Sequence, residues 1–144
     1  MSDLYFIIRF VHVLGAIAVG YYLLLPFLVS RMGRDSAAVQ SGYLKNLFQM
    51  NRIGQYILIL QFLTGGYMIS QYEYSIWWIV LVIVVFVIVG ALAGMMSRPM
   101  KKLSASLERG ESERGQIGKI QTYSTLLAIA LIVLVVLMVF PSFR

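Results

Sequence analysis

The chain has 144 residues, of which 60% are hydrophobic and 12% are charged, and its formal net charge is +6. Its mean hydropathy of +0.82 is too high for a soluble domain of this size to bury its apolar side chains. The absence of cysteine excludes disulfides, thiolate metal ligands and heme attached through a CxxCH motif. Because the basic residues lie beside apolar stretches, we expect anionic lipid headgroups, and not nucleic acid, as their partner.

Four apolar stretches follow one another along the chain, and each is long enough to cross a hydrocarbon core about 30 Å thick as a helix. We predict membrane spans at approximately residues 4–29, 53–70, 76–96 and 124–140. Runs such as 79–89 are apolar on every face and lack the alternation of a transmembrane β-strand. The sequence therefore predicts an all-α integral membrane protein, a four-helix bundle that forms a single domain in contact with the lipid bilayer.

The basic residues predict an orientation for this bundle. Ten of the twelve lie between spans one and two or between spans three and four: Arg31, Arg34, Lys45, Arg52, Arg98, Lys101, Lys102, Arg109, Arg114 and Lys119. Loops rich in lysine and arginine face the cytoplasm. We therefore expect a multi-pass protein of the plasma (inner) membrane, with the N-terminus and C-terminus both non-cytoplasmic and anionic headgroups at the basic loops.

Two prolines lie at the ends of predicted spans. Pro26 is expected to kink the inner end of the first span, and Pro99 is expected to end the third. The spans are otherwise predicted to be continuous helices, which argues against a stand-alone secondary transporter.

The first two spans contain the polar residues that could carry chemistry. Arg9 and His12 are three residues apart and share a helical face, and ionisable groups inside a span usually face protein or water. His12 is the only histidine, and a rise of 1.5 Å per residue places it about 12 Å below the start of the span, level with Gln61. We predict that Arg9, His12, Gln61 and Thr64 line one polar pocket in the outer half of the bundle.

Two interpretations of this pocket remain open. A neutral His12 imidazole can ligate heme iron or copper, form a hydrogen bond to a quinone, or relay protons. If heme b were bound by two histidines, the second would come from another chain; otherwise the second ligand would be a methionine such as Met68, a tyrosine, water or nothing. Alternatively, a hydrogen bond between His12 and Gln61 only holds two helices together, while Arg9 reaches the headgroups or Glu73.

Small residues predict close helix packing. Gly90 and Gly94 form a small-xxx-small step, which we expect to pack within the bundle, with a homodimer or a partner membrane protein as the alternative. Gly15 and Gly65 indicate further close contacts between helices.

Two segments carry a resemblance to known proteins: LYFIIRFVHVLGAIAVGYYLLLPFLVSR, which contains HVLGA at 12–16, and QFLTGGYMI at 61–69. They resemble a group of small four-span bacterial membrane proteins and, more remotely, the HemJ-type protoporphyrinogen oxidases and the CopD-like copper-resistance domains. The resemblance implies a four-helix bundle in which His12 matches the first-span histidine that HemJ-type proteins use for heme. The second and third spans lack the lysine that is important in HemJ-type proteins, so protoporphyrinogen oxidation is not implied.

Three functions agree with these features. The first is a heme- or quinone-associated redox protein centred on His12. The second is a non-enzymatic membrane scaffold or accessory subunit that packs through the Gly90 face. The third is a proton or small-ion pathway through the first two spans.

Overall fold

A computed structural model describes residues 3–140, and these residues form a bundle of helices. The first span consists of α1 (Asp3–Val19), the 3₁₀-helix η1 (Gly20–Leu23) and α2 (Leu25–Met32), and the others are α3 (Ala37–Ser70), α4 (Ile76–Glu108) and α5 (Arg114–Val139). All four segments are long and apolar enough to cross a membrane. The prediction of an all-α four-helix membrane bundle is confirmed.

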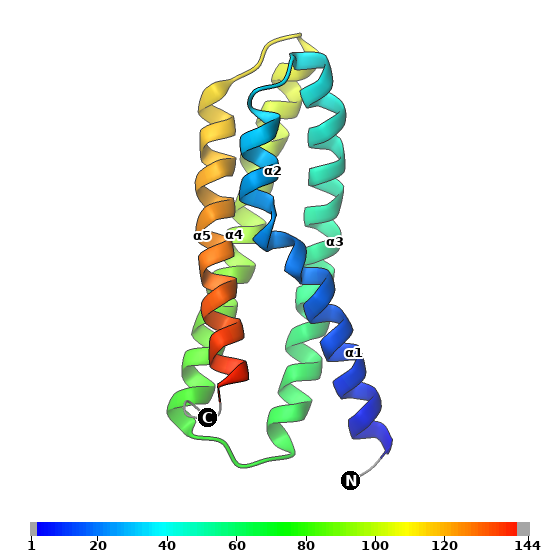
Figure 1. Cartoon of the computed structure of the whole chain (residues 1–144), viewed down its shortest axis with the longest axis vertical. Coiled ribbons are helices and arrows are strands. Elements are labelled where there is room, and N and C mark those ends of the chain that lie inside the picture. Colours follow the sequence, from blue (N-terminus) through cyan, green and yellow to red (C-terminus); the bar gives the residue numbers. More distant parts are fainter. Residues whose placement is uncertain (1–2, 141–144) are drawn as a thin grey trace.

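The bundle has two ends of different character (Figure 1). One end, here called the terminal end, contains the start of α1, the turn between α3 and α4, and the end of α5. The opposite end, here called the loop end, contains the connections at 33–36 and 109–113. The side of the membrane that each end faces stays a prediction, and Arg144 lies outside the described residues.

The helices extend beyond the predicted apolar stretches at the loop end. The expectation that Pro99 ends the third span is wrong, because α4 continues through Pro99 to Glu108. A proline inside a helix removes its own backbone donor, here the one that would reach the Met95 carbonyl, and its ring crowds that carbonyl. Pro99 is itself buried, and Met96 and Met100 on either side of it are fully buried in the core. This packing offsets the lost hydrogen bond and keeps the helix intact.

The first span is broken, so the expectation of a continuous helix is wrong. The Leu24 amide donates to the Tyr21 carbonyl at 2.9 Å, which is the spacing of a 3₁₀-helix. Pro26 follows two residues later and has no N–H to donate to the Tyr22 carbonyl, as an α-helix would require. The distortion expected near Pro26 is therefore present, but it lies on its N-terminal side, at 20–24.

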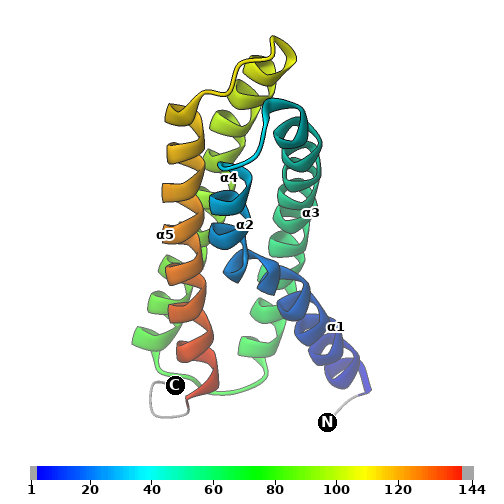
Figure 2. The ribbon, with the colours of Figure 1, turned by 45° about the horizontal axis from the view of Figure 1, so that its top comes forward.

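This break lets the first span change partners within the bundle. α1 packs against α3, whereas η1 and α2 pack against α5. Figure 1 and Figure 2 both show α1 leaning away from α5 towards the terminal end. The half of the bundle near the terminal end is therefore less tightly closed on the side of the first span.

Tyr22 holds the break against the rest of the bundle. Its side chain is fully buried, and its hydroxyl donates to Asn51 Oδ1 of α3 at 2.8 Å. Asn51 Nδ2 in turn donates to the Ala93 carbonyl of α4 at 3.0 Å. Gly54 makes room for the ring, since a Cβ there would lie 2.5 Å from the Tyr22 hydroxyl oxygen. This buried polar network, which no sequence pattern indicated, connects three spans.

Large apolar side chains are exposed on all four spans. Phe27 is 72% exposed, Leu63 64%, Ile76 76% and Val139 62%. The bilayer covers such surface in a membrane protein. The chain is therefore a multi-pass membrane protein whose outer surface contacts lipid.

Candidate functional site

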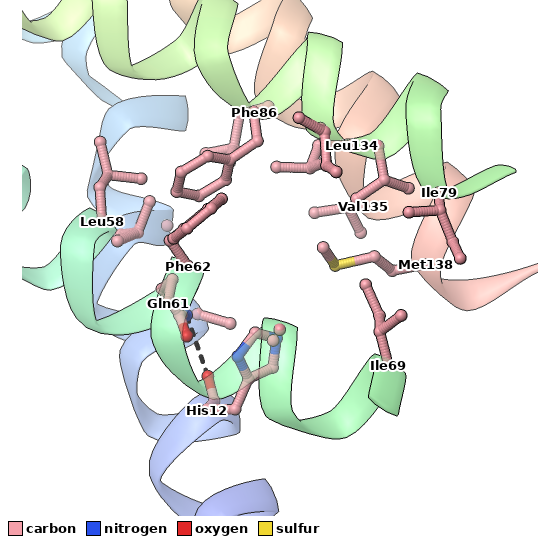
Figure 3. A pocket seen from close by; sticks show the side chains of 18 of the residues that line it. His12, Leu58, Gln61, Phe62, Ile69, Ile79, Phe86, Leu134, Val135 and Met138 are labelled. Carbon is pink, nitrogen blue, oxygen red and sulfur yellow. Dashed lines mark hydrogen bonds between the residues drawn. The ribbon is translucent and has the colours of Figure 1, made fainter. Parts of the chain in front are cut away.

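A cavity of about 300 Å³ lies in the half of the bundle near the terminal end. It is lined mainly by aliphatic and aromatic side chains, among them Phe62 of α3, Phe86 of α4 and Met138 of α5 (Figure 3). Of its described lining residues, His12 and Gln61 alone have polar side chains. We expected the functional residues on spans one and two. The two polar residues of the cavity do lie there, but α4 and α5 supply much of its apolar wall.

His12 projects from α1 into this cavity (Figure 3), and its Nδ1 atom lies 2.8 Å from Thr64 Oγ1. The Thr64 hydroxyl has one proton, and its oxygen also lies 2.8 Å from the Leu60 carbonyl oxygen, one helical turn earlier. The hydroxyl therefore donates to Leu60 and accepts from Nδ1–H of His12. His12 Nε2 is then an acceptor, and it has no hydrogen-bond partner in the part of the chain that the structure describes.

Gln61 connects the same two helices. Its Nε2 atom donates to the His12 backbone carbonyl at 2.9 Å, while its Oε1 atom is buried without a partner among residues 3–140. The expected hydrogen bond between His12 and Gln61 is confirmed, but it uses the backbone and leaves the imidazole to Thr64.

Two glycines allow α1 and α3 to approach closely at this site. A Cβ at Gly15 would lie 2.9 Å from Gln61 Cδ, and one at Gly65 would lie 3.2 Å from His12 Cε1. The close contacts predicted at both glycines are confirmed. They hold His12 at the edge of the cavity.

The polar edge of the cavity offers acceptors without donors. His12 Nε2 and Gln61 Oε1 both carry lone pairs, and apolar side chains surround them. Leaving such groups without hydrogen bonds in an apolar site costs free energy. The cavity therefore complements a largely apolar ligand that donates hydrogen bonds.

Arg9 does not share this cavity with His12. It is exposed, and it lines a separate surface depression together with Tyr5, Met68 and Glu73. Residues three apart on a helix differ by about 60° in direction, which is enough to send them to different surfaces. The structure thus brings His12, Gln61 and Thr64 together and places Arg9 and Met68 elsewhere. Met138, on the last span, is the methionine that lines the cavity.

The prediction that Gly90 and Gly94 pack within the bundle is wrong. A Cβ at either position would meet no atom within 4 Å. The buried side of α4 is formed instead by Val89, Ala93 and Met96. The small-residue step therefore has no other helix packed closely against it.

Comparison of the chain with protein-family models, with curated proteins and with solved structures gives no match. The resemblance to HemJ-type and CopD-like proteins therefore stays a prediction. No group of three or more His, Asp or Glu side chains that could hold a metal ion occurs among residues 3–140. A metal at His12 would need ligands of another kind.

Proposed function

We propose that the protein binds the ring of a lipid-soluble quinol beside His12 and acts in the quinone-dependent redox chemistry of its membrane. The unpartnered His12 Nε2 acceptor at the edge of an apolar cavity is the observation that carries this proposal. A quinol ring is apolar except for its hydroxyl groups, which are hydrogen-bond donors. One hydroxyl matches Nε2, and Gln61 Oε1 offers a second acceptor nearby.

The apolar walls suit the ring and its tail. Phe62 and Phe86 lie with their ring centroids 5.7 Å apart at the cavity, where they offer an aromatic surface to a bound ring. Phe62 is 52% exposed and Val135, also in the lining, is 47% exposed, so the cavity reaches the outer surface of the bundle. A hydrophobic tail attached to the ring would extend from there into the bilayer.

His12 has two roles in this proposal. Its Nε2 atom accepts the hydrogen bond from the quinol hydroxyl, and it would take up that hydroxyl proton when a separate redox partner removes the electrons from the ring. Thr64 is a positioning residue, because its hydroxyl fixes the Nδ1–H tautomer and the direction of the imidazole.

Heme b is the second candidate, and Met138 is the observation that favours it. The Met138 and His12 side chains both point into the cavity (Figure 3), and imidazole with thioether is one of the axial ligand pairs of heme iron. A bound heme would supply one-electron chemistry. Its two propionates require cations or water, however, and no lysine or arginine is among the described residues that line the cavity. The quinol is therefore the better fit.

The two other functions have different support. On α3, Gln61 of the His12 site and Gln55 beside the Tyr22–Asn51 network are six residues apart, about 9 Å, with the buried Leu58 between them. This separation argues against a continuous proton or ion pathway. A scaffold or accessory role is favoured by the outward-facing step at Gly90, which offers a surface for a second copy or another membrane protein.

Quinol binding can be tested with the purified protein in a neutral detergent. The probe is a decyl-substituted benzoquinol kept reduced without air, and equilibrium dialysis measures its dissociation constant. His12→Leu should weaken binding about tenfold or more, because it removes the acceptor from an apolar site. The oxidised quinone, which has no hydroxyl to donate, should bind more weakly than the quinol.

A matched pair of threonine variants separates positioning from folding. Thr64→Val should weaken quinol binding, and Thr64→Ser should restore it. Thr122→Val is the control, since the exposed Thr122 hydroxyl donates to the Gly118 carbonyl at 2.9 Å in the same i−4 geometry. Unchanged quinol binding in folded His12→Leu would refute the proposal. A Soret absorbance band that His12→Leu abolishes would favour heme instead.

A further inference from the structure

We propose that a groove between α4 and α5 at the loop end binds the anionic phosphodiester headgroup of a membrane phospholipid. The groove has a volume of about 430 Å³ and is lined by three basic side chains, those of Arg98, Lys102 and Lys119. None of its described lining residues is acidic. It shares no residue with the cavity beside His12, and the inference does not depend on the proposed function.

Helical spacing brings the basic residues to one place. Arg98 and Lys102 are four residues apart on α4, and Lys119 and Tyr123 are four apart on α5, so each pair lies on one face of its helix. The two helices pack against each other, and all four residues line the groove between them. Two rows of side chains therefore face a common space.

The positive charges of the groove have no counterpart within the described part of the chain. The ion pairs found between residues 3 and 140 join Arg109 to Glu111 and to Glu113, each at 3.9 Å. Like charges four residues apart on a helix repel each other. A bound anion would relieve this repulsion among the cations of the groove.

The depth of the groove indicates a lipid as the source of the anion. The apolar stretch 76–96 is about 30 Å long as a helix, which matches the hydrocarbon core, and Arg98 follows it after one residue, Ser97. Tyr123 is half-buried just before the apolar part of α5, at the level where tyrosine favours the membrane interface. The groove thus lies where phospholipid phosphates lie.

Two further residues favour a hydroxyl-bearing lipid with room for its chain. Gly94 lines the groove, and a Cβ there would meet nothing within 4 Å, so space continues towards the apolar part of α4. Gln116 also lines the groove, and its Oε1 atom is buried without a hydrogen-bond partner among the described residues. A glycerol headgroup would donate a hydroxyl to this oxygen. Phosphatidylglycerol has both the phosphate and the hydroxyls.

The test compares three probes on the purified full chain in a neutral detergent: phosphatidylglycerol, phosphatidylcholine and inorganic phosphate. Native mass spectrometry measures the dissociation constant of each. The variant R98Q/K102Q/K119Q should bind phosphatidylglycerol at least tenfold more weakly, since each basic residue near an anionic lipid surface contributes about fivefold. Phosphatidylcholine should bind more weakly than phosphatidylglycerol to the wild type.

A control variant of equal charge distinguishes a site from general attraction. R34Q/K45Q/K101Q also removes three cations near the loop end, but none of these residues lines the groove. Its affinity for phosphatidylglycerol should fall less than threefold. Equal losses in both triple variants would overturn the proposal, because they would show a diffuse attraction. Inorganic phosphate binding as tightly as phosphatidylglycerol would overturn the assignment to a lipid.

A second variant tests the groove without altering charge. Gly94→Leu keeps every cation, and its side chain fills part of the groove that is open space in the wild type. The variant should therefore fold normally, but it should bind phosphatidylglycerol several-fold more weakly than the wild type. Gly118→Leu is its control, because Gly118 is exposed on α5 with nothing within 4 Å of an added Cβ and lies outside the groove. Equal lipid affinity in these two variants would refute a bound headgroup in the groove.

Discussion

Gly54→Ala tests whether the packing around Tyr22 stabilises the break in the first span. The new Cβ would lie 2.5 Å from the Tyr22 hydroxyl oxygen and 3.0 Å from Cζ, so the fully buried ring must move or be compressed. Overpacking of this kind costs about 1–3 kcal/mol, and breaking the hydrogen bond to Asn51 costs a similar amount. Replacing glycine by alanine in a helix gains about 0.5–1 kcal/mol. We therefore expect a net loss of about 1–5 kcal/mol.

Equilibrium unfolding in mixed micelles, with increasing sodium dodecyl sulfate and detection by circular dichroism, measures this change. Gly42→Ala is the matched control on the same helix, because Gly42 is exposed with no atom within 4 Å of an added Cβ. It should stabilise the protein by about 0.5–1 kcal/mol. In a Tyr22→Phe background, which lacks the nearest atom, the cost of Gly54→Ala should fall. If Gly54→Ala is as stabilising as Gly42→Ala, the described packing is refuted.

Three further predictions concern single residues. Tyr22→Phe should lower the free energy of unfolding by about 1–3 kcal/mol in the same assay, because it leaves Asn51 Oδ1 buried without its donor; a change below about 0.5 kcal/mol would contradict the network. Gly65→Ala should weaken quinol binding several-fold in equilibrium dialysis by displacing the His12 ring, whose Cε1 atom would lie 3.2 Å from the new Cβ; unchanged affinity would show that the exact ring position is unimportant. Gly90→Leu should not destabilise the chain, since it extends into open space, and chemical cross-linking should show less self-association if this face is a dimer contact.

Several features of the site could be predicted because they depend on local periodicity. His12 and Gln61 are level because the helical rise is constant, and the structure joins them by a hydrogen bond. Gly15 and Gly65 also correctly indicated a close approach of two helices, since Gly15 lies against Gln61 and Gly65 lies against His12. The spacing did not reveal which polar group is the hydrogen-bond partner of the imidazole. Arg9 and His12 differ in direction by about 60°, and the position of α3 decides which of the two side chains contacts it.

The positions of the four spans follow from the sequence alone, because the cost of burying backbone and polar groups in hydrocarbon is summed over about twenty residues and tolerates local variation. How the first span divides its contacts between α3 and α5 depends on long-range packing that the structure reveals, and that division shapes the cavity beside His12. The sequence also did not indicate which residues of α4 and α5 form the cavity walls, since the aliphatic side chains of these helices are alike on every face. Which face of such a helix is buried depends on its neighbours, as Gly90 and Gly94 show, where an added Cβ would meet no atom within 4 Å.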